Sequence, residues 1–457
     1  MNKIRFLIAF YGAKAIQFLM KILGRNATYL PGKFASKISK DFLAHLKPPK
    51  TVIAVTGTNG KTTVSNLLTS ILKENGYSVT NNSFGSNVQA GVISALIEDT
   101  SLSGNPKKDI AVLEVDERSS LLVYPYMKPD YLVCNNIMRD SMKRNAHTEF
   151  ISFIINKALP ASTTLILNAD DFISSRFGAE DQHRIYFGME AEIPQQSNPQ
   201  HIRDIVYCPK CGDALEAEYI RYNHIGRQFC PACGLKSPTP DYAVTQIDRE
   251  NNTFTVRHGD VQETYTLIND NVVNVYNFCG AITLLHQLGL TYEQISKGFS
   301  QSKIVKTRFE EVTAGNLRIT MLMSKGQNPI ACTRCFDYVA KVPAENKGII
   351  VIGDDLSDNT NESESTCWIY ESDYSLLKDP SIGQIVIGGP RCKDVYLRAL
   401  LAGIDADKIV TTNDMTNTAD LLDITTCKDI FVLHDLSRPR EAAVIKSKLI
   451  NRGEGGM

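Results

Sequence analysis

The sequence predicts an α/β protein in which two domains, each built on a parallel sheet, follow one another. Short β-branched runs alternate with segments of helical periodicity, first within residues 49–302 and again within residues 303–457. Strands that alternate with helices favour a parallel sheet with helices on both faces. The length of 457 residues is sufficient for two to four domains of roughly 100–200 residues each.

Eight short runs are predicted as strands. They are residues 51–55, 110–113, 131–134 and 164–167 in the first domain, and residues 348–352, 384–387, 408–410 and 429–433 in the second. Residues 62–75 and 149–159 carry apolar side chains at helical spacing and are predicted as helices. A polar run, residues 356–366, is expected to form an exposed loop of the second domain.

Residues 1–48 are expected to form a helical segment in front of the first domain. Phe6, Phe10 and Ala13 fall near helical spacing, and the longest uncharged stretch, residues 6–13, is far shorter than the ~20 residues of a membrane span. We expect this helix to pack on the following domain. The alternative is a basic amphipathic helix that touches a membrane surface, which would place the protein at the inner face of the plasma membrane.

The composition is that of a folded protein without a nucleic-acid-binding charge excess. Hydrophobic residues make up 43% and charged residues 22%, and 49 basic side chains balance 50 acidic ones. We therefore expect no nucleic acid as the main partner. Eleven cysteines without a secretory signal indicate reduced thiols and a cytoplasmic protein.

The segment Val-Thr-Gly-Thr-Asn-Gly-Lys-Thr-Thr at residues 55–63 predicts a loop that binds the phosphates of ATP. Between a strand and a helix, its backbone N–H groups and the helix N-terminus can surround a triphosphate. Lys61 can neutralise the β and γ phosphates, and the Thr62 hydroxyl can hold Mg²⁺. Val55 stands where the strict motif has glycine. The predicted nucleotide-binding residues are Thr56, Gly57, Thr58, Asn59, Gly60, Lys61, Thr62 and Thr63.

Three acids, Glu114, Asp116 and Glu117, follow the predicted strand at residues 110–113. Nucleotide sites form at the carboxyl ends of parallel strands, where a carboxylate near the metal is needed. We assign Glu114 to the metal, and Lys61, Glu114 and Glu117 to the catalytic group. The alternative is a solvated strand end.

Two cysteine pairs, Cys208/Cys211 and Cys230/Cys233, are each followed by glycine and lie in a segment that interrupts the α/β pattern. Four thiolates at this spacing predict a structural Zn²⁺ site in an inserted zinc ribbon at about residues 205–237. Nucleic-acid binding through the ribbon is a weaker alternative, because no dense basic or aromatic cluster lies between the pairs. Cys332 and Cys335 are expected to be idle thiols.

These motifs resemble the Mur ligase superfamily, which joins amino acids onto peptidoglycan precursors. The resemblance implies a Mur ligase-type central domain with the inserted ribbon, followed by a second, Rossmann-like α/β domain. It also implies that Asn274 and Asn277 contact adenine and that Arg308 belongs to the nucleotide site. The matching segments are residues 56–63 (TGTNGKTT), 167–171 (LNADD), 274–277 (NVYN) and 307–310 (TRFE).

The sequence is similar to the MurT branch of this superfamily in particular. An inserted zinc ribbon is a mark of that branch, and the further matches are residues 30–33 (LPGK), 113–117 (LEVDE), 134–136 (CNN) and 139–140 (RD). The resemblance implies a carbon–nitrogen ligase that uses ATP and Mg²⁺ to convert the α-carboxyl of D-glutamate in lipid II to an acyl phosphate. Ammonia from a GatD-like glutamine amidotransferase partner, in a heterodimer, would then give D-isoglutamine. Asp355 and Asp358 are the acids expected to complete the partner's Cys-His pair.

Two alternatives accompany this interpretation, because the last third of the sequence departs from the branch. The protein could be a stand-alone amino-acid ligase of the Mur or folylpolyglutamate type. It could also be a nucleotide-binding paralogue that has lost the chemistry.

Overall fold

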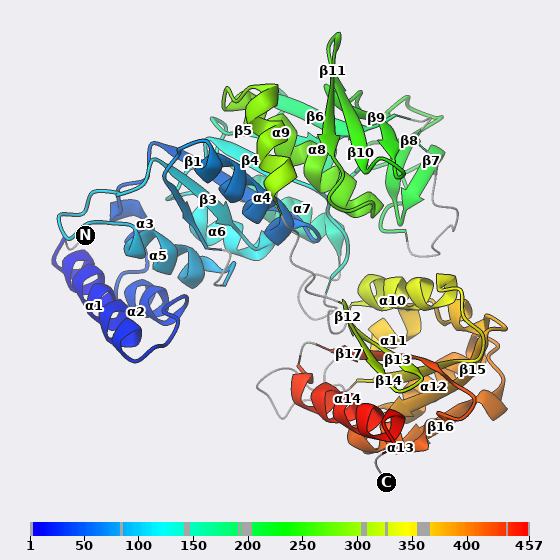
Figure 1. Ribbon diagram of the computed structural model, residues 1–457. Helices are drawn as coiled ribbons and strands as arrows, with labels where there is room; N and C mark the ends of the chain where they lie inside the picture. The colour runs from blue at the N-terminus through cyan, green and yellow to red at the C-terminus, as the bar shows by residue number, and fades with distance from the viewer. Residues whose placement is uncertain are drawn as a thin grey trace. The chain divides into compact units, whose positions relative to one another are not determined.

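The computed structural model describes residues 3–82, 86–140, 147–190, 193, 203–302, 309–324, 328–353, 366–435 and 437–455. The chain divides into two compact units (Figure 1). The first consists of Met1–Met138, His147–Pro199 and Arg203–Ile304, and most of the second is Val305–Met457. Arg139 and Asp140 group with the second unit, where Arg139 pairs with Glu371 at 2.7 Å and Asp140 accepts a hydrogen bond from Asn328 at 2.7 Å.

The first unit contains a nine-stranded sheet in the order β11-β10-β9-β6-β5-β4-β1-β3-β2. The strands from β9 to β2 in this order run parallel, and β10 and β11 are antiparallel to their neighbours. The strands are β1 (Thr51–Thr56), β2 (Val79–Asn81), β3 (Ile110–Glu114), β4 (Tyr131–Cys134), β5 (Thr164–Asn168), β6 (Arg184–Met189), β9 (Tyr242–Asp248), β10 (Thr253–His258) and β11 (Val261–Thr266). The four predicted strands of this unit are thus confirmed as β1, β3, β4 and β5.

Helices cover both faces of this sheet, as the continuous apolar runs of its central strands require. Helices α4, α8 and α9 lie over one face, while α5, α6 and α7 pack with α1 to α3 in the cluster on the other face. The helices are α1 (Lys3–Ile22), α2 (Leu30–Ile38), α3 (Phe42–His45), α4 (Lys61–Glu74), α5 (Gln89–Glu98), α6 (Ser120–Val123), α7 (Thr148–Ala158), α8 (Val272–Gln287) and α9 (Tyr292–Gln301). Within the described residues, no helix combines the length and the apolar character needed to cross a membrane.

The sequence did not predict strands β9 to β11, of which β10 and β11 run antiparallel to their neighbours. Asn252 and Gly259 have positive φ of 52° and 56°, which permits the tight turns on either side of β10. Phe254 and Val256 are buried, but they alternate with polar residues that face outward. The sheet is therefore mixed rather than purely parallel, with β10 and β11 at one end of the strand order.

An inserted hairpin, β7 (Glu216–Tyr222) and β8 (Ile225–Phe229), forms its own two-stranded sheet between β6 and β9. Two buried acids that follow β5 anchor it. The Tyr219 hydroxyl donates to Asp170 at 3.2 Å, and His224 lies 3.1 Å from Asp171. The conspicuous Asp170-Asp171 pair thus holds the insertion on the sheet.

The second unit contains a six-stranded sheet in the order β12-β13-β17-β14-β15-β16, parallel except for β12. Ile349 and Val351 of β14 are buried in one hydrophobic cluster, and Ile350 and Ile352 are buried in another, so both faces are covered. Its elements are β12 (Phe309–Ala314), β13 (Leu317–Ser324), α10 (Pro329–Lys341), β14 (Lys347–Ile352), α11 (Cys367–Glu371), β15 (Ile382–Gly388), α12 (Cys392–Leu401), β16 (Ile409–Thr412), α13 (Thr418–Leu421), β17 (Asp429–Asp435) and α14 (Pro439–Gly453). The four strands predicted for this unit are confirmed as β14 to β17, and the β12–β13 hairpin was not predicted.

Candidate active site

The loop between β1 and α4 has a backbone that only glycine can adopt at two positions. Gly57 and Gly60 have φ of 118° and 92°. A Cβ atom on Gly57 would lie 2.8 Å from the Asn136 carbonyl oxygen, and one on Gly60 would lie 2.1 Å from Asn277 Oδ1. The glycines therefore let the loop lie directly against the neighbouring strand end and against α8.

The segment after β4 fixes the loop from the side. The Thr58 amide donates to the Asn136 carbonyl at 2.8 Å, and the Asn59 amide donates to Asn136 Oδ1 at 3.0 Å. The Thr58 hydroxyl exchanges hydrogen bonds with the backbone of Met138 at 3.0 and 2.9 Å. These contacts fix the position of the loop against the segment after β4.

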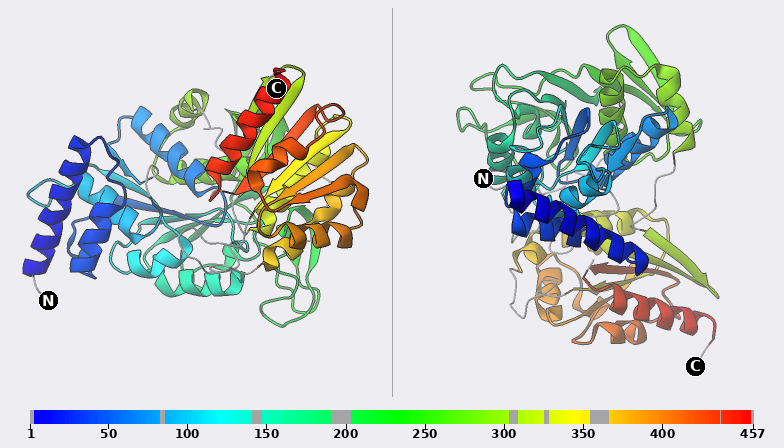
Figure 2. Two further views of the ribbon diagram at one scale, coloured as in Figure 1. Left: turned by 90° about the horizontal axis from the view of Figure 1, so that it is seen from below. Right: turned by 90° about the vertical axis from the view of Figure 1, so that its left-hand side faces the viewer.

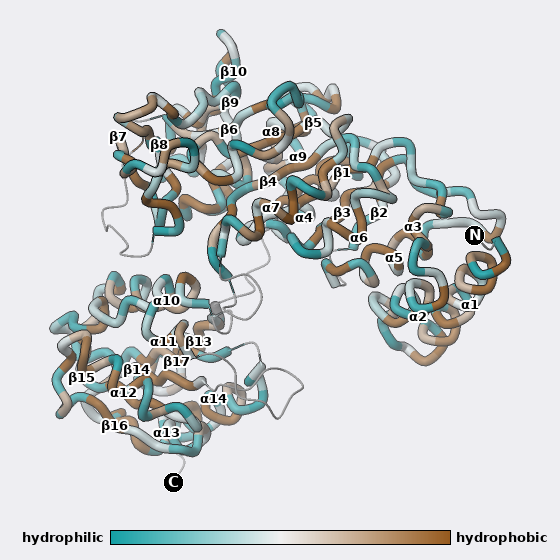
Figure 3. The backbone as a smooth tube through the Cα atoms, turned by 180° about the vertical axis from the view of Figure 1, so that it is seen from behind, coloured by the Kyte–Doolittle hydropathy of each residue, from teal (hydrophilic) through white to brown (hydrophobic). Residues whose placement is uncertain are grey.

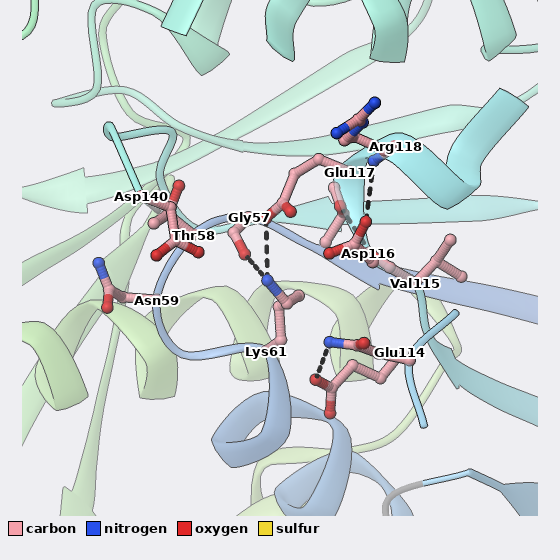
Figure 4. Close-up of polar contacts among 12 residues, drawn as sticks. Gly57, Thr58, Asn59, Lys61, Glu114, Val115, Asp116, Glu117, Arg118 and Asp140 are labelled. Atoms are coloured by element: carbon pink, nitrogen blue, oxygen red, sulfur yellow. Dashed lines mark hydrogen bonds and ion pairs between the residues drawn. The ribbon is translucent and has the colours of Figure 1, made fainter. Parts of the chain in front are cut away.

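Lys61, the first residue of α4, points back beneath the loop (Figure 4). Its ammonium donates to the Gly57 carbonyl and lies 2.8 Å from Glu117 Oε1, with side-chain exposures of 9% for Lys61 and 2% for Glu117. Burial disfavours the charged lysine, but Glu117, Glu114 and Asp116 together outweigh burial and raise the pKa of Lys61. Burial also raises the pKa of the Glu117 carboxyl, an effect that Lys61 only partly offsets. Lys61 is therefore protonated and places a positive charge under the loop.

Thr62 and Glu114 form a second contact at the start of α4. The Thr62 hydroxyl donates to Glu114 Oε2 at 2.8 Å, and Asn87 donates to Glu114 Oε1 at 3.3 Å. Asn82 braces the Glu114 backbone, with its side chain bonded to both the amide and the carbonyl at 2.8 and 2.9 Å. Hydroxyl and carboxylate oxygens are the ligands that Mg²⁺ prefers, so this pair fits a magnesium site. Thr62 is exposed, which leaves room for water and substrate oxygens.

A chain of asparagine amides connects α8 to the loop region. Asn135 Nδ2 donates to Asn277 Oδ1 at 2.9 Å, Asn277 Nδ2 donates to Asn274 Oδ1 at 3.3 Å, and Asn274 Nδ2 donates to Asn269 Oδ1 at 3.0 Å. The structure thus places Asn277 against Gly60 and Asn274 beside Asn277. Amides of this kind offer both donors and acceptors to a base.

Some of the predicted site residues point away from the loop, and others lie outside the described residues. The Thr56 hydroxyl donates to the Val115 carbonyl at 3.0 Å, so this side chain faces β3 and offers the site only its backbone. Arg308, Asp355 and Asp358 lie outside the described residues. Thr63 is half-buried on the first turn of α4.

Three asparagines of the site were missed or noted only as part of a resemblance. They are Asn82, Asn87 and Asn136, which fix Glu114 and the loop. Asn82 directly follows β2, and Asn136 follows β4 by two residues. A search for polar residues at the carboxyl ends of all parallel strands, rather than for acids alone, would have found these two.

The four cysteines of the inserted hairpin come together at its base. Sulfur atoms lie 3.6 Å apart for Cys208 and Cys233, and 3.4 Å apart for Cys211 and Cys230. Four sulfurs around a tetrahedral zinc, with bonds of ~2.3 Å, would be separated by about 3.8 Å. In each pair the amide of the following glycine donates to the carbonyl of the first cysteine, at 2.8 and 3.0 Å, which gives two matching turns. The donor set and its spacing fit a closed Zn²⁺ site.

Comparisons with known proteins identify the family. The model of the Mur ligase middle domain matches residues 55–285, and that of the MurT ligase C-terminal domain matches residues 326–437. Subunit MurT of the glutamine-hydrolyzing lipid II isoglutaminyl synthase from Staphylococcus aureus is 30% identical over 419 residues, which cover 91% of this chain and 92% of the relative. The chain belongs to the MurT family of Mur ligases. The corresponding Streptococcus pneumoniae subunit is 29% identical over 422 residues, covering 92% of both chains.

Structural comparison agrees with a Mur ligase fold for this MurT-family chain. A pseudomurein peptide ligase type C from Methanothermus fervidus matches with a TM-score of 0.64 at 20% identity, covering 92% of this chain and 83% of that one. The predictions of the family, the α/β fold and a ligase are therefore confirmed. The match over residues 326–437 includes the region in which the sequence departed from the motifs of the branch.

Proposed function

We propose that this MurT-family chain is the ATP-using subunit of a lipid II isoglutaminyl synthase. It would phosphorylate the α-carboxyl of D-glutamate in lipid II and support its amidation to D-isoglutamine. The observation that carries the proposal is the pair of contacts at the start of α4. Lys61 is held under the phosphate loop by Glu117, and Thr62 with Glu114 forms an oxygen site beside it.

The chemistry needs charge neutralisation more than acid–base catalysis. A carboxylate oxygen attacks the γ phosphorus and ADP leaves. The nitrogen of ammonia then attacks the acyl carbon, phosphate leaves, and a proton is lost to solvent. Lys61 would turn from Glu117 to the β and γ phosphates, and Glu117 would hold it in place between turnovers. Magnesium, held by Thr62 and Glu114, would supply further positive charge to the phosphates.

We assign the remaining residues of the site by their position. The backbone amides of residues 60–62 would bind phosphate oxygens at the N-terminus of α4, since the amides of Thr58 and Asn59 already donate to Asn136. Asn274 and Asn277 would contact adenine, since the Asn277 amide lies against Gly60 and Asn274 is hydrogen-bonded to Asn277. The nucleotide role of Arg308 and the partner-completing role of Asp355 or Asp358 rest on the family resemblance alone.

The cysteine cluster would hold a structural zinc ion. All four ligands come from the protein, so the fourth coordination position is not left open for a substrate. The cysteines lie at the base of the β7–β8 hairpin, where a metal would hold the two turns together. We propose no chemistry at this ion.

Ammonia would come from a second subunit, a GatD-like glutamine amidotransferase. The family members from Staphylococcus aureus and Streptococcus pneumoniae are themselves named as subunits of a glutamine-hydrolyzing enzyme. A ligase that acts alone would instead take a free amino acid. The inserted ribbon favours the MurT branch, whose members act with a partner subunit.

We also propose that helix α1 lies on the inner face of the membrane, where lipid II is available. Phe10, Ala13 and Gln17 face α2 and α5, with Gln17 Nε2 donating to the Ser94 carbonyl at 2.8 Å. The opposite face is also apolar and is exposed; it carries Ile4, Leu7, Ile8, Tyr11, Phe18, Leu19 and Ile22. Figure 2 shows α1 alongside α2 at the N-terminal edge of the first unit, and Figure 3 shows its hydrophobic character.

The charge of α1 favours an anionic lipid surface as the occupant of this face. Five basic residues and no acidic ones lie between residues 3 and 25. Lys3, Lys14 and Lys21 fall along one border of the apolar face, and Arg5 falls along the other. A basic group near an anionic membrane contributes about 1 kcal/mol to binding, and Lys21, which pairs with Glu98 at 2.7 Å, would contribute less.

Sedimentation with vesicles would test the membrane face. The full chain should bind vesicles of phosphatidylglycerol and phosphatidylcholine, and the double variant Ile8→Glu/Phe18→Glu should not. Phe153→Glu, a matched change at an exposed phenylalanine of α7, should bind like the wild type. Vesicle binding by Ile8→Glu/Phe18→Glu at the wild-type level would contradict the proposal. So would a wild-type chain that forms a dimer through this face and binds no vesicles.

The catalytic proposal is tested by reconstitution. The full chain with a GatD-like subunit, lipid II, glutamine, ATP and Mg²⁺ should release ADP and phosphate, and mass spectrometry should find one carboxyl of lipid II converted to an amide. ADP release with a free amino acid and no partner would favour the stand-alone ligase. ATP binding without phosphate release under any of these conditions would favour the non-catalytic paralogue.

A further inference from the structure

Three side chains of the first unit form a cluster that the proposed reaction does not use. His258 ends β10, Glu263 lies in β11, and His286 lies in the last turn of α8. Within the antiparallel pair, His258 faces Val261 and Glu263 faces Val256. His258 and Glu263 therefore project from the same face of the hairpin, the face against which the end of α8 packs.

The donor atoms of these residues are spaced as the ligands of one ion. Glu263 Oε2 lies 2.9 Å from His286 Nε2 and 3.5 Å from His258 Nε2. The three potential ligand atoms all lie within 4.8 Å of one another. A tetrahedral zinc with bonds of about 2.0–2.1 Å separates its nitrogen and oxygen ligands by about 3.3 Å. Small side-chain adjustments suffice to reach that geometry.

The surrounding contacts hold the carboxylate and leave one imidazole nitrogen available. The Tyr265 hydroxyl donates to Glu263 Oε2 at 2.5 Å, the kind of outer contact that orients a ligating carboxylate. The Tyr242 ring stacks on both imidazoles, at 4.9 Å from His258 and 5.7 Å from His286. Among the described residues, the buried His258 Nε2 has no hydrogen-bond partner. A buried nitrogen without a partner is unfavourable unless something else binds it.

We propose that His258, Glu263 and His286 bind a divalent transition-metal ion, with zinc as the best match. Two imidazoles and one carboxylate suit zinc and its neighbours, whereas Mg²⁺ and Ca²⁺ take oxygen ligands. The side chains are exposed by 25%, 8% and 12%, so an ion can enter from solvent. Three protein ligands leave a further position to water.

The ion would tie the β10–β11 hairpin to the C-terminal end of α8 (Figure 1). His286 is nine residues after Asn277, which places it roughly 14 Å farther along the helix. The proposed site therefore lies away from Asn277 and the phosphate loop, and it shares no residue with the cysteine cluster. It would stabilise the helix that presents Asn274 and Asn277 to the loop, without taking part in the reaction.

Metal content measured by mass spectrometry tests the proposal. The full chain, equilibrated with zinc alone and freed of excess metal, should hold one equivalent more than His286→Gln or His258→Asn. His183→Gln changes an exposed histidine outside the cluster and should retain the wild-type amount. Cobalt titration should show the same loss, without loss of the thiolate absorption bands that a cysteine site produces.

A second variant separates metal binding from simple packing. Tyr265→Phe keeps all three ligands but removes the hydrogen bond to Glu263, so it should weaken zinc binding about 10-fold. If circular dichroism shows that His286→Gln does not fold, the zinc content of His258→Asn, a change at the partly exposed end of β10, is compared with that of the wild type instead. Equal zinc content in the wild type and His258→Asn, or an unchanged zinc affinity in Tyr265→Phe, would overturn the proposal.

Discussion

The ammonium of Lys61 lies 2.8 Å from the carboxylate of Glu117, and both side chains are almost fully buried beneath the phosphate loop. A buried ion pair of this kind has two consequences. It fixes the position of the ammonium group that would neutralise the phosphates. It also means that removing either side chain alone lowers the free energy of unfolding, because the other charge stays buried without its partner. The two effects can be measured separately.

Glu117→Gln is expected to lower the free energy of unfolding by about 3–5 kcal/mol, because Lys61 is left as an unpaired buried charge. Lys61→Met should have a cost of the same order, since Glu117 is then unpaired. The double variant removes both charges and should be less destabilised than the sum of the two. Urea denaturation measures all three. Additive losses would show that the two side chains do not interact.

Lys61→Met should reduce kcat/KM for ATP about 10²–10³-fold, the usual loss when one group that stabilises developing charge is removed. Glu117→Gln should reduce it less, because the lysine that meets the phosphates is retained. Steady-state ADP release in the presence of partner and lipid II is the measurement. A larger loss in Glu117→Gln than in Lys61→Met would assign direct contact with the reacting groups to Glu117 instead.

Thr62→Ala should raise the Mg²⁺ concentration needed for half-maximal activity about 10–100-fold, because the 2.8 Å contact of its hydroxyl with Glu114 marks the metal site. Thr62→Ser keeps a hydroxyl at that position and should behave like the wild type. Binding of ADP without Mg²⁺ should be unchanged in both. Equal magnesium requirements in Thr62→Ala and Thr62→Ser would place the metal elsewhere.

The parallel strands could be predicted because burial on both faces leaves a continuous apolar run. The strand predicted at residues 110–113 is β3, and every residue of β3 is buried. Strand β10 has the sequence Thr-Phe-Thr-Val-Arg-His, in which apolar residues only alternate, so it does not stand out as a buried run. The solvation of one face is therefore the physical reason that β10 escaped prediction.

The site was predictable where its residues are neighbours in sequence and not where the fold brings them together. Lys61 and Thr62 lie within one short motif, which alone predicts phosphate and metal contacts. The sequence analysis assigned both Thr62 and Glu114 to the metal, but the sequence did not indicate that Glu117 would pair with Lys61. It also gave no sign that Gly60 would lie against Asn277, because that contact joins a loop to a helix more than two hundred residues later.

Gly60→Ala should weaken ATP binding more than 10-fold, since the new Cβ would lie 2.1 Å from Asn277 Oδ1 at a φ of 92°. Gly76→Ala is the matched control. Gly76 follows α4 with a φ of 84°, but nothing lies within 4 Å of an added Cβ. That variant carries the same backbone strain, about 1–2 kcal/mol, and should bind ATP normally. Isothermal titration calorimetry compares the two. Equal affinities would mean that the loop tolerates displacement from α8.

Asp170 and Asp171 are adjacent, equally buried and shifted in opposite directions, so the two should respond oppositely to acid. Burial raises the pKa of Asp170, and no neighbour fully offsets it. Burial also acts on Asp171, but His224 and Ser174 outweigh it and lower the pKa of that carboxyl. The Asp171 carboxylate therefore stabilises the fold at pH values above 3.8, its pKa in the unfolded chain, and this stabilisation is lost as the pH falls through its folded pKa.

Urea denaturation between about pH 5 and pH 3 should show that the difference in free energy of unfolding between the wild type and Asp171→Asn becomes smaller at the acid end. For Asp170→Asn, the free energy of unfolding of the wild type should rise relative to the variant as the pH falls towards 3.8. The reason is that Asp170 takes up its proton at a higher pH in the folded chain than in the unfolded chain. Parallel pH dependence in the two variants would contradict the opposite ionisation of the pair that anchors the inserted hairpin.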